Sequence, residues 1–247
     1  LNLHADEFNI SAIEITFDKA NDIVIGKGSV EAVDSDGRII KTDNITYEKQ
    51  REFLQAEGSV EIFDTEGNIL KSNKASYDKI NEIITTFKNS ELSTKEGYTI
   101  TSDKILYNNI KKIISSNQNA TLTDIDGNIA EVSMFQYNVD KNLFSAVGKI
   151  KIIDKSKNTY FFKELHVDTK RREMVGSNVS VVLDKKNFGL NEKNDPRFAA
   201  NDIFVSKEKT TLSKGVFTVC QLRDDKCPPW SLQAKKIIHD KAKKTIY

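Results

Sequence analysis

This chain of 247 residues has few of the residue types on which most active sites depend. It contains two cysteines, which is too few for a four-cysteine zinc site. Its three histidines, His4, His166 and His239, do not have the sequence spacing of metal-ligand pairs. A glycine-rich phosphate-binding loop is also missing. We therefore expect no enzyme active site, no metal site and no cofactor.

Strong charge of one sign and long apolar runs are missing as well. The formal net charge is +1, so the chain as a whole has no field that would attract nucleic acid or an anionic membrane. No apolar run approaches the ~20 residues of a transmembrane helix. The chain begins at Leu1 without a signal peptide or an initiator methionine, so we expect a processed or excised fragment whose compartment is left open.

What the chain does have is a repeat of 30 residues. Aromatic residues mark the first five repeats and a valine marks the sixth: Phe17, Tyr47, Tyr77, Tyr107, Tyr137 and Val167. An acidic or amide residue follows each of them: Asp18, Glu48, Asp78, Asn108, Asn138 and Asp168. A fixed period predicts one structural unit stacked many times. Such an array works through a long surface or groove rather than a compact pocket.

Two turn sites divide each repeat. One follows the aromatic residue, as in 78–81, and the other ends in Gly37, Gly67, Gly97 or Gly127. The acidic pairs of the second kind, such as Asp34 and Asp36, fit tight-turn chemistry better than a calcium loop, whose ligand spacing they lack. The turns leave about eleven residues for each strand, or roughly 36 Å at 3.3 Å per residue.

Alternation of apolar and polar residues favours strands over helices. Leu54, Ala56, Gly58, Val60 and Ile62 fall on one face, with polar residues between them. The register restarts twice, after a polar loop at 185–196 and after the cysteine-containing segment 220–229. Eight repeats then give about sixteen antiparallel strands. We predict an all-β fold in a single domain spanning residues 1–247.

Apolar residues recur 7 and 15 residues past each repeat marker and, in most repeats, 13 residues past it, where Ser90 and Ser180 are exceptions. Small residues such as Gly26 and Gly58 lie between them. Small residues let a long strand bend, so that the sheet folds over on itself. Two interpretations stay open: the folded sheet fills its interior, or the small residues leave an apolar groove between two facing layers. The groove would be lined by Val24, Val30, Leu54, Val60, Ile62, Ile84, Leu92, Ile114, Leu122, Phe144, Ile150, Ile152 and column mates such as Val182.

The repeated pattern of aromatic-Asp, Ala-x-Gly-x-Val and Asp-x-x-Gly resembles the OstA-type periplasmic domains of lipopolysaccharide transport. LptA, LptC and the N-terminal part of LptD share these domains. The tail resembles the end of the N-terminal domain of LptD more specifically, through Cys220, Cys227-Pro228-Pro229-Trp230 and Ile237-Ile238-His239-Asp240. The resemblance implies a periplasmic β-jellyroll, part of an outer-membrane protein of a Gram-negative bacterium, that holds lipopolysaccharide acyl chains in its apolar interior.

The resemblance also implies partners. The N-terminal edge strand, near Leu3 to Ile15, would pair with LptA. The chain would continue into its own outer-membrane barrel, which the lipoprotein LptE plugs. Family members join cysteines of this domain to cysteines of the barrel by disulfides, and Cys220 and Cys227 are the matching candidates. A local disulfide between these two residues, or two reduced thiols, are the alternatives.

Two other functions stay open. A periplasmic bridge protein of the LptA kind would lack the Cys-Pro-Pro-Trp tail. A structural β-repeat protein, such as an adhesin segment, would fill its interior and take up no lipid. If lipid is bound, rim lysines such as Lys71, Lys104 and Lys149 are candidates for contact with the sugar and phosphate head group.

Overall fold

The computed structural model describes residues 2–5, 8–188, 191, 193–222, 228–240, 242–243 and 245–247. The chain divides into two compact units, Leu1–Leu122 (unit 1) and Thr123–Tyr247 (unit 2). The single domain expected from the unbroken repeat stays a prediction.

Unit 1 consists of strands and one short 3-10 helix. In chain order these are β1 (Asn2–Ala5), β2 (Phe8–Ser11), β3 (Glu14–Asp18), β4 (Ile23–Asp34), β5 (Ile39–Glu48), η1 (Lys49–Arg51), β6 (Phe53–Phe63), β7 (Ile69–Asp78), β8 (Ile83–Ser93), β9 (Thr99–Asn108), β10 (Ile113–Ser116) and β11 (Ala120–Thr123), whose last residue is the first of unit 2.

Unit 2 has the same plan. Its elements are β12 (Ile129–Asn138), β13 (Leu143–Ile153), β14 (Thr159–Asp168), β15 (Glu173–Val182), η2 (Lys185–Phe188), β16 (Arg197–Val205), β17 (Lys209–Thr218), β18 (Leu232–Asp240) and β19 (Thr245–Ile246). The predicted polar loop thus begins with a 3-10 turn and ends where β16 starts.

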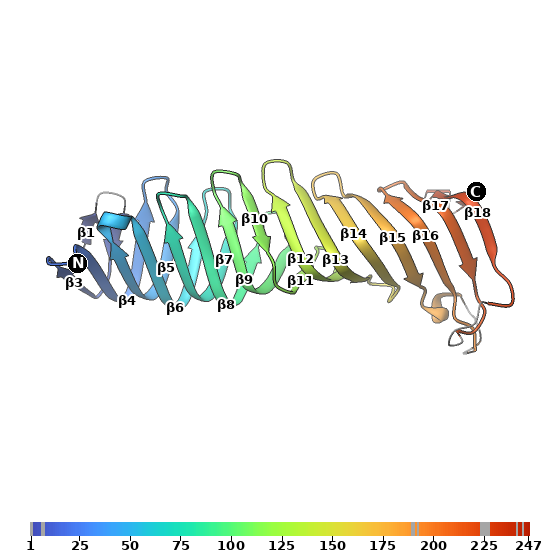
Figure 1. Cartoon of the computed structure of the whole chain (residues 1–247), viewed down its shortest axis with the longest axis horizontal. Coiled ribbons are helices and arrows are strands. Elements are labelled where there is room, and N and C mark those ends of the chain that lie inside the picture. Colours follow the sequence, from blue (N-terminus) through green and yellow to red (C-terminus); the bar gives the residue numbers. More distant parts are fainter. Residues whose placement is uncertain are drawn as a thin grey trace. The chain divides into compact units, whose positions relative to one another are not determined.

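Strands that follow one another in the sequence pair antiparallel within each unit (Figure 1). The described residues contain nineteen strands, of which β2 and β3 pair with the two ends of β4, and β10 and β11 both pair with β9. Counting each interrupted strand once leaves seventeen, one more than the sequence predicted. The all-β prediction is therefore confirmed. No helix in the described part of the chain is long and apolar enough to cross a membrane.

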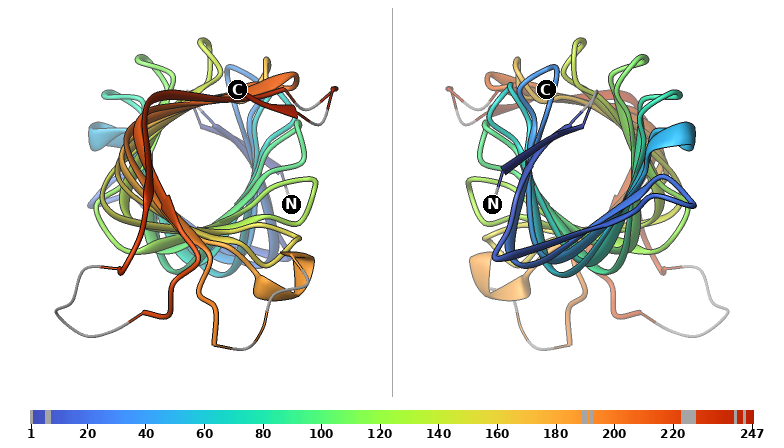
Figure 2. Two further views of the ribbon diagram at one scale, coloured as in Figure 1. Left: turned by 90° about the vertical axis from the view of Figure 1, so that its right-hand side faces the viewer. Right: turned by 90° about the vertical axis from the view of Figure 1, so that its left-hand side faces the viewer.

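Each long strand bends near its middle. The pairing register of β5 with β6 shifts between Lys41 and Asn44, and that of β6 with β7 shifts between Glu57 and Val60. The backbone at Gly58 has φ +84°, a conformation that glycine adopts without steric cost. These bends curve the strands of each unit around an interior instead of leaving a flat sheet (Figure 2).

The glycine-ended turns form as the sequence predicted. In the first, the Asp34 Oδ1 atom accepts the N–H groups of Asp36 at 3.0 Å and Arg38 at 2.8 Å, and Gly37 has φ +86°. The same carboxylate pattern recurs at Asp64 and Asp124, and Asp154 accepts the Asn158 N–H at 2.9 Å. Short side chains that accept hydrogen bonds from residues two to four positions ahead are typical of tight turns.

The turns after the aromatic residues explain why an acidic or amide residue follows most of them; Glu48 is an exception, because its side chain makes no capping bond to its turn. The Asp78 Oδ1 atom accepts the Asn81 N–H at 3.0 Å, which closes the turn. Asn108, Asn138 and Asp168 do the same for the residue three positions ahead. Asp240 accepts the Lys243 N–H at 3.0 Å, so the pattern restarts at His239-Asp240 as predicted.

Candidate functional site

The residues predicted to line a groove lie in the interiors of the two units. Eight of them in unit 1 are at most 3% exposed: Val24, Val30, Leu54, Val60, Ile62, Ile84, Leu92 and Ile114. In unit 2, Phe144 and Ile150 are buried. Leu122 and Ile152 are half-buried. The inward direction of these columns follows from the sequence alternation, whereas lipid contact stays a prediction.

The prediction for Val182 is wrong, because its side chain faces outward and is 45% exposed. Its neighbour Val181 is buried instead. In β13 the buried residues on either side of the bend, Ala146 and Ile150, are four positions apart, whereas in β15 Gly176 and Val179 are three apart. The bend in the sixth repeat therefore uses one residue fewer, and every position after it changes face.

The small residues do not leave room for a ligand at three positions. A Cβ atom on inward-facing Gly26 would lie 2.9 Å from Ile45 Cγ2, and one on Gly176 would lie 2.5 Å from Phe162 Cδ1. Neighbouring side chains thus fill the space above both residues. A Cβ atom on Gly58 would lie 2.5 Å from Oδ2 of Asp43, which is exposed. The expectation that Gly58 opens a groove is therefore wrong: Gly58 serves the bend.

The two ends of the strands meet in space. In unit 1, β5 and β7 run in the same direction because both pair antiparallel with β6. On a flat sheet, the start of β5 and the end of the ten-residue β7 would lie roughly 33 Å apart. However, Arg38 Nη1 lies 2.6 Å from Tyr77 Oη, and Lys79 Nζ lies 2.8 Å from Asp36 Oδ2. The sheet is folded over so completely that its opposite margins touch.

We name these margins by their turns. The first turn row comprises 34–38, 64–68 and 94–98 in unit 1, and 124–128 and 154–158 in unit 2. The second turn row comprises 19–22, 49–52, 79–82 and 109–112 in unit 1, and 139–142 and 169–172 in unit 2. The seam is the line within each unit along which its first row meets its second row.

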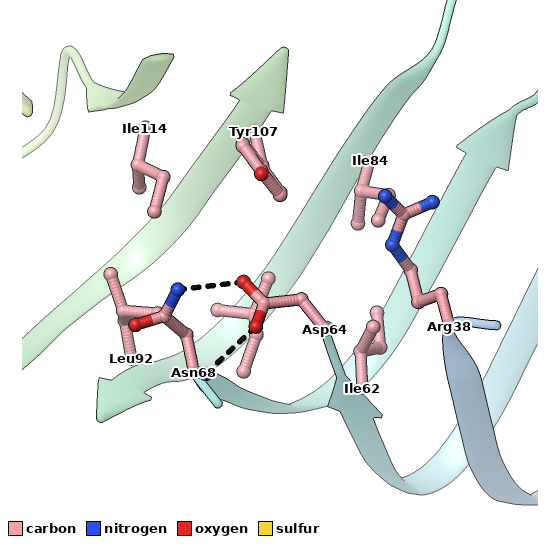
Figure 3. Close-up of a pocket in the computed structure, with 9 residues that line it drawn as sticks. Arg38, Ile62, Asp64, Asn68, Ile84, Leu92, Tyr107 and Ile114 are labelled. Atoms are coloured by element: carbon pink, nitrogen blue, oxygen red, sulfur yellow. Dashed lines mark hydrogen bonds between the residues drawn. The ribbon is translucent and has the colours of Figure 1, made fainter. Parts of the chain in front are cut away.

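A small cavity lies beneath the seam of unit 1 (Figure 3). Ile62, Leu70 and Leu92 line it from the half that carries the first row, and Ile84, Tyr107 and Ile114 line it from the other half. Arg38, Asp64 and Asn68 complete the lining. The volume is about 20 Å³, enough for about one water molecule.

A buried polar cluster crosses the seam above this cavity. Arg38 Nη1 lies 2.9 Å from Asp34 Oδ2, and the two side chains are 5% and 1% exposed. Tyr77 donates its phenolic hydrogen to Glu82 at 2.9 Å. Burial raises the pKa of Tyr77 well above its ordinary value, although the Arg38 charge opposes the shift. Tyr77 therefore stays protonated and binds both partners. Phe8 packs edge-on against its ring, with the ring centroids 5.9 Å apart.

Lys79 supplies the second crossing. Its side chain is only 8% exposed, and its Nζ atom lies 2.8 Å from Asp36 and 2.5 Å from Glu82. Burial lowers the pKa of Lys79, but the hydrogen bonds to both carboxylates outweigh burial and raise it. Burial raises the pKa of Glu82, but bonds from Lys79, Asn109 and Tyr77 outweigh it and hold the pKa below its ordinary value. Lys79 and its two carboxylate partners, Asp36 and Glu82, are thus charged at neutral pH.

The same kind of pair recurs along the seam. In unit 1, Lys112 of the second row lies 3.8 Å from Glu66 of the first row. In unit 2, Arg172 of the second row contacts Asp126 of the first row. At the Lys79, Lys112 and Arg172 crossings the first row contributes the carboxylate and the second row the cation. Arg38 of the first row, in contrast, lies 3.9 Å from Glu82 of the second row with the charges reversed. Sequence reasoning missed this line, although the acidic residue before each turn glycine was a visible signal.

Along the first row, an asparagine links three of the turns to the segment that follows. Asn68 donates from Nδ2 to Asp64 at 2.7 Å, and its Oδ1 accepts the Lys95 N–H at 3.2 Å. Asn128 and Asn158 of unit 2 make the same two bonds to their neighbours. Arg38 occupies the equivalent position of its own turn and also bonds to the turn aspartate, but it reaches across the seam to Tyr77.

The predicted rim lysines lie on the outer surface. Lys71 pairs with Glu61 at 2.8 Å, Lys104 lies over the Phe87 ring, and Lys149 is exposed. Cys220 is half-buried, with its Sγ atom 3.7 Å from the Trp230 carbonyl oxygen. Cys227 lies outside the described residues, so the disulfide alternatives stay predictions. Within the described ranges, no cluster of three histidine, cysteine, aspartate or glutamate residues could hold a metal ion.

Comparison with known proteins gave one solved structure of interest. No protein-family model and no curated protein matches the chain. The chain is similar to "LptH, the LptA homologous periplasmic component of the conserved lipopolysaccharide transport device from Pseudomonas aeruginosa", at 16% identity over 69% of this chain and 84% of that chain. The TM-score is 0.21, so this likeness establishes neither the family nor the function of the chain.

Proposed function

We propose that the protein is a non-enzymatic carrier that holds the acyl chains of lipopolysaccharide in its apolar interior. The observation that carries this proposal is the buried apolar lining, which every repeat of unit 1 rebuilds from the same inward columns. Each buried methylene contributes about 0.8 kcal/mol, so one acyl chain gains several kcal/mol. A lining that repeats offers many similar weak positions, which suits passage along the array better than capture in one deep site.

The tail motif favours the LptD-like form of this function over the LptA-like form. In that form the chain works in the periplasm as part of an outer-membrane protein. Its N-terminal edge, at β1 to β3, receives lipopolysaccharide from LptA, and its C-terminal end leads into its own barrel with LptE. An LptA-like bridge protein is the alternative within the same class, and it would use the same interior.

A structural β-repeat with a filled interior is the second candidate, and specific observations favour it. The cavity beneath the seam of unit 1 measures about 20 Å³. Side chains also occupy the space above Gly26 and Gly176. A protein of this kind would bind no lipid at all, which makes the two candidates separable by one experiment.

The experiment places a photo-crosslinking amino acid at Leu54, Val60 or Phe144 and, as the control, at Glu57. The first three side chains are buried, whereas the Glu57 side chain is 58% exposed on the outer face of β6. After irradiation with purified lipopolysaccharide, we expect crosslinked product from the inward positions and none from Glu57. Equal labelling at all four positions, or none at the inward ones in a folded variant, would favour the structural repeat.

A further inference from the structure

The seam differs from every other junction in the folded sheet. Neighbouring strands are joined by continuous ladders of backbone hydrogen bonds. The crossings described above, in contrast, are made between side chains: Arg38 to Tyr77, Lys79 to Asp36, and Lys112 to Glu66 in unit 1. A few side-chain contacts can separate and reform without unfolding a strand, whereas a backbone ladder cannot.

Each turn row, in contrast, is tied along its length. In the second row of unit 1, Lys79 donates its N–H to the Glu52 carbonyl at 3.0 Å, and Asn109 donates to the Glu82 carbonyl at 2.9 Å. In the first row, Asn68 links its turn to the next through Lys95. The linked turns should therefore move together, so that a change of distance at the Lys79 crossing is shared with the Lys112 crossing.

We propose that the seam of unit 1 is a latch of ion pairs that opens to admit a fatty acyl chain into the interior from the side. Opening separates Asp36 and Glu66 from Lys79 and Lys112, and Arg38 from Tyr77, and it enlarges the cavity beneath them. The bends at the strand centres, such as the one at Gly58, are where the two halves would hinge. The part of this inference that concerns lipid rests on the proposed function.

The ion pairs of Lys79 with Asp36 and of Lys112 with Glu66 suit a reversible latch, whereas the Arg38 to Tyr77 crossing, in which Arg38 is 5% exposed, is the firmest point of the seam. An ion pair at a surface is a weak bond, because water solvates both charges once they separate. Asp36 is already 57% exposed and Glu66 is 29% exposed, so neither carboxylate needs to leave a dry site. Lys79, at 8% exposed, moves into water when the seam opens. Cavity-lining Ile62, Ile84 and their neighbours would then be exposed unless an apolar ligand covers them.

The test measures the seam directly in the full chain. Spin labels are attached through a ketone-bearing amino acid at Ser35 and Ile80, which are exposed residues of the two facing turns, so that the cysteines are left untouched. Distances between the labels are recorded for the wild type, for Lys79→Met and for the control Lys71→Met. Lys71 pairs with Glu61 at 2.8 Å, the same length as the Lys79 to Asp36 pair, but between adjacent strands.

We expect Lys79→Met to raise the population with long label distances by about fivefold, the factor expected from losing one ion pair of this kind. Uptake of the fluorescent fatty acid cis-parinaric acid should accelerate by a similar factor. Lys71→Met should change neither measurement. Raising the salt concentration should lengthen the distances in the wild type and have less effect in Lys79→Met, because salt screens the pair.

Unchanged distances in Lys79→Met would overturn the latch. Longer distances without faster uptake of cis-parinaric acid would overturn the seam as the route for the acyl chain. If Lys79→Met does not fold, Lys112→Met with labels at Thr65 and Ile110, which are also exposed, makes the same comparison at the next crossing. Failure of the proposed function has a different signature: the seam opens and admits cis-parinaric acid, but lipopolysaccharide neither binds nor crosslinks.

Discussion

The two units close their seams with contacts of different strength. In unit 1, Arg38 and Lys79 cross the seam with side chains only 5% and 8% exposed, within a cluster that includes Asp34 and Tyr77. In unit 2, the described crossing joins Arg172, which is 51% exposed, to Asp126. The 30-residue repeat therefore fixes where the turn rows run, while individual substitutions decide how firmly they are joined.

One substitution accounts for much of this difference. The residue after the turn glycine position is Arg38 in the first turn, Tyr98 in the third, and an asparagine, such as Asn158, in the others. Asn158 donates to Asp154 at 2.9 Å and accepts the Asp184 N–H at 3.0 Å, so it links turns along the row. Arginine keeps the bond to its turn aspartate, and its Nη1 atom also donates across the seam to Tyr77 at 2.6 Å. The residue at this position thus either links neighbouring turns along the first row, as Asn158 does, or joins the two rows across the seam, as Arg38 does.

The largest effect is expected at this buried arginine. Arg38→Met removes the cation that balances buried Asp34, so the free energy of unfolding should fall by about 3–5 kcal/mol. The matched change in unit 2, Arg172→Met, should cost about 1 kcal/mol or less, because that pair is half exposed. Urea denaturation of the full chain, followed by far-UV circular dichroism, measures both. Similar small losses would mean that the two seams are held equally weakly.

A smaller effect is expected at the glycines that shape the two units. Gly58→Ala should cost at least about 2 kcal/mol, because φ is +84° and the new Cβ overlaps the Asp43 carboxylate. Gly127→Ala has nearly the same φ, +82°, but nothing within 4 Å, so it should cost about 1 kcal/mol.

Thermal unfolding of both variants separates backbone strain from steric overlap, since the strain is common to the two sites. If Gly127→Ala costs as much as Gly58→Ala, the close approach of Asp43 to the bend contributes nothing. The bend of unit 1 would then be no more tightly packed than the turn of unit 2.

The smallest effect is expected from acid. The pKa values of Asp36 and Glu82 lie below their ordinary values of 3.8 and 4.5, Asp36 chiefly through its bond with Lys79. Carboxyl groups with lowered folded-state pKa values stabilise the fold above their unfolded pKa. That stability is lost as the pH falls below about 4.5 and through the folded values.

Urea denaturation at pH 7, 5, 4 and 3 should therefore show a steeper loss of stability for the wild type than for Lys79→Met, which lacks the shared cation. Parallel pH profiles would mean that the Lys79 crossing does not hold these carboxylates in their charged form. The stronger closure of the seam in unit 1 would then depend on Arg38 alone.

Local chemistry made most of the fold predictable. An aromatic residue followed by aspartate or asparagine places a turn, because the short side chain accepts the N–H three residues ahead. Alternation identified the inward residues from Val24 to Ile150. Glycine marked several bends and turns, yet Lys88 adopts φ +63° at one bend and Lys157 adopts φ +64° at one turn. At those positions the surrounding sheet imposes a conformation that the residue itself does not favour.

The seam was not predictable from one sequence. Lys79 and Asp36 are 43 residues apart, and nothing in the repeat states how far the sheet must fold before those residues meet. The outward position of Val182 was missed for a related reason: a bend that is one residue shorter reverses the alternation without leaving any mark in composition. Both failures concern how a strand curves, which depends on its neighbours.

The asparagine bridges of the first row have a consequence for how such a chain can grow. Asn68, Asn128 and Asn158 each present one amide oxygen to a backbone N–H of the segment that follows, so this link does not depend on the place of the turn in the series. Duplicating thirty residues would therefore supply its own connection at both ends. The length of the repeat array can therefore change during evolution in steps of thirty residues. A substitution such as Arg38 makes one repeat differ from the others.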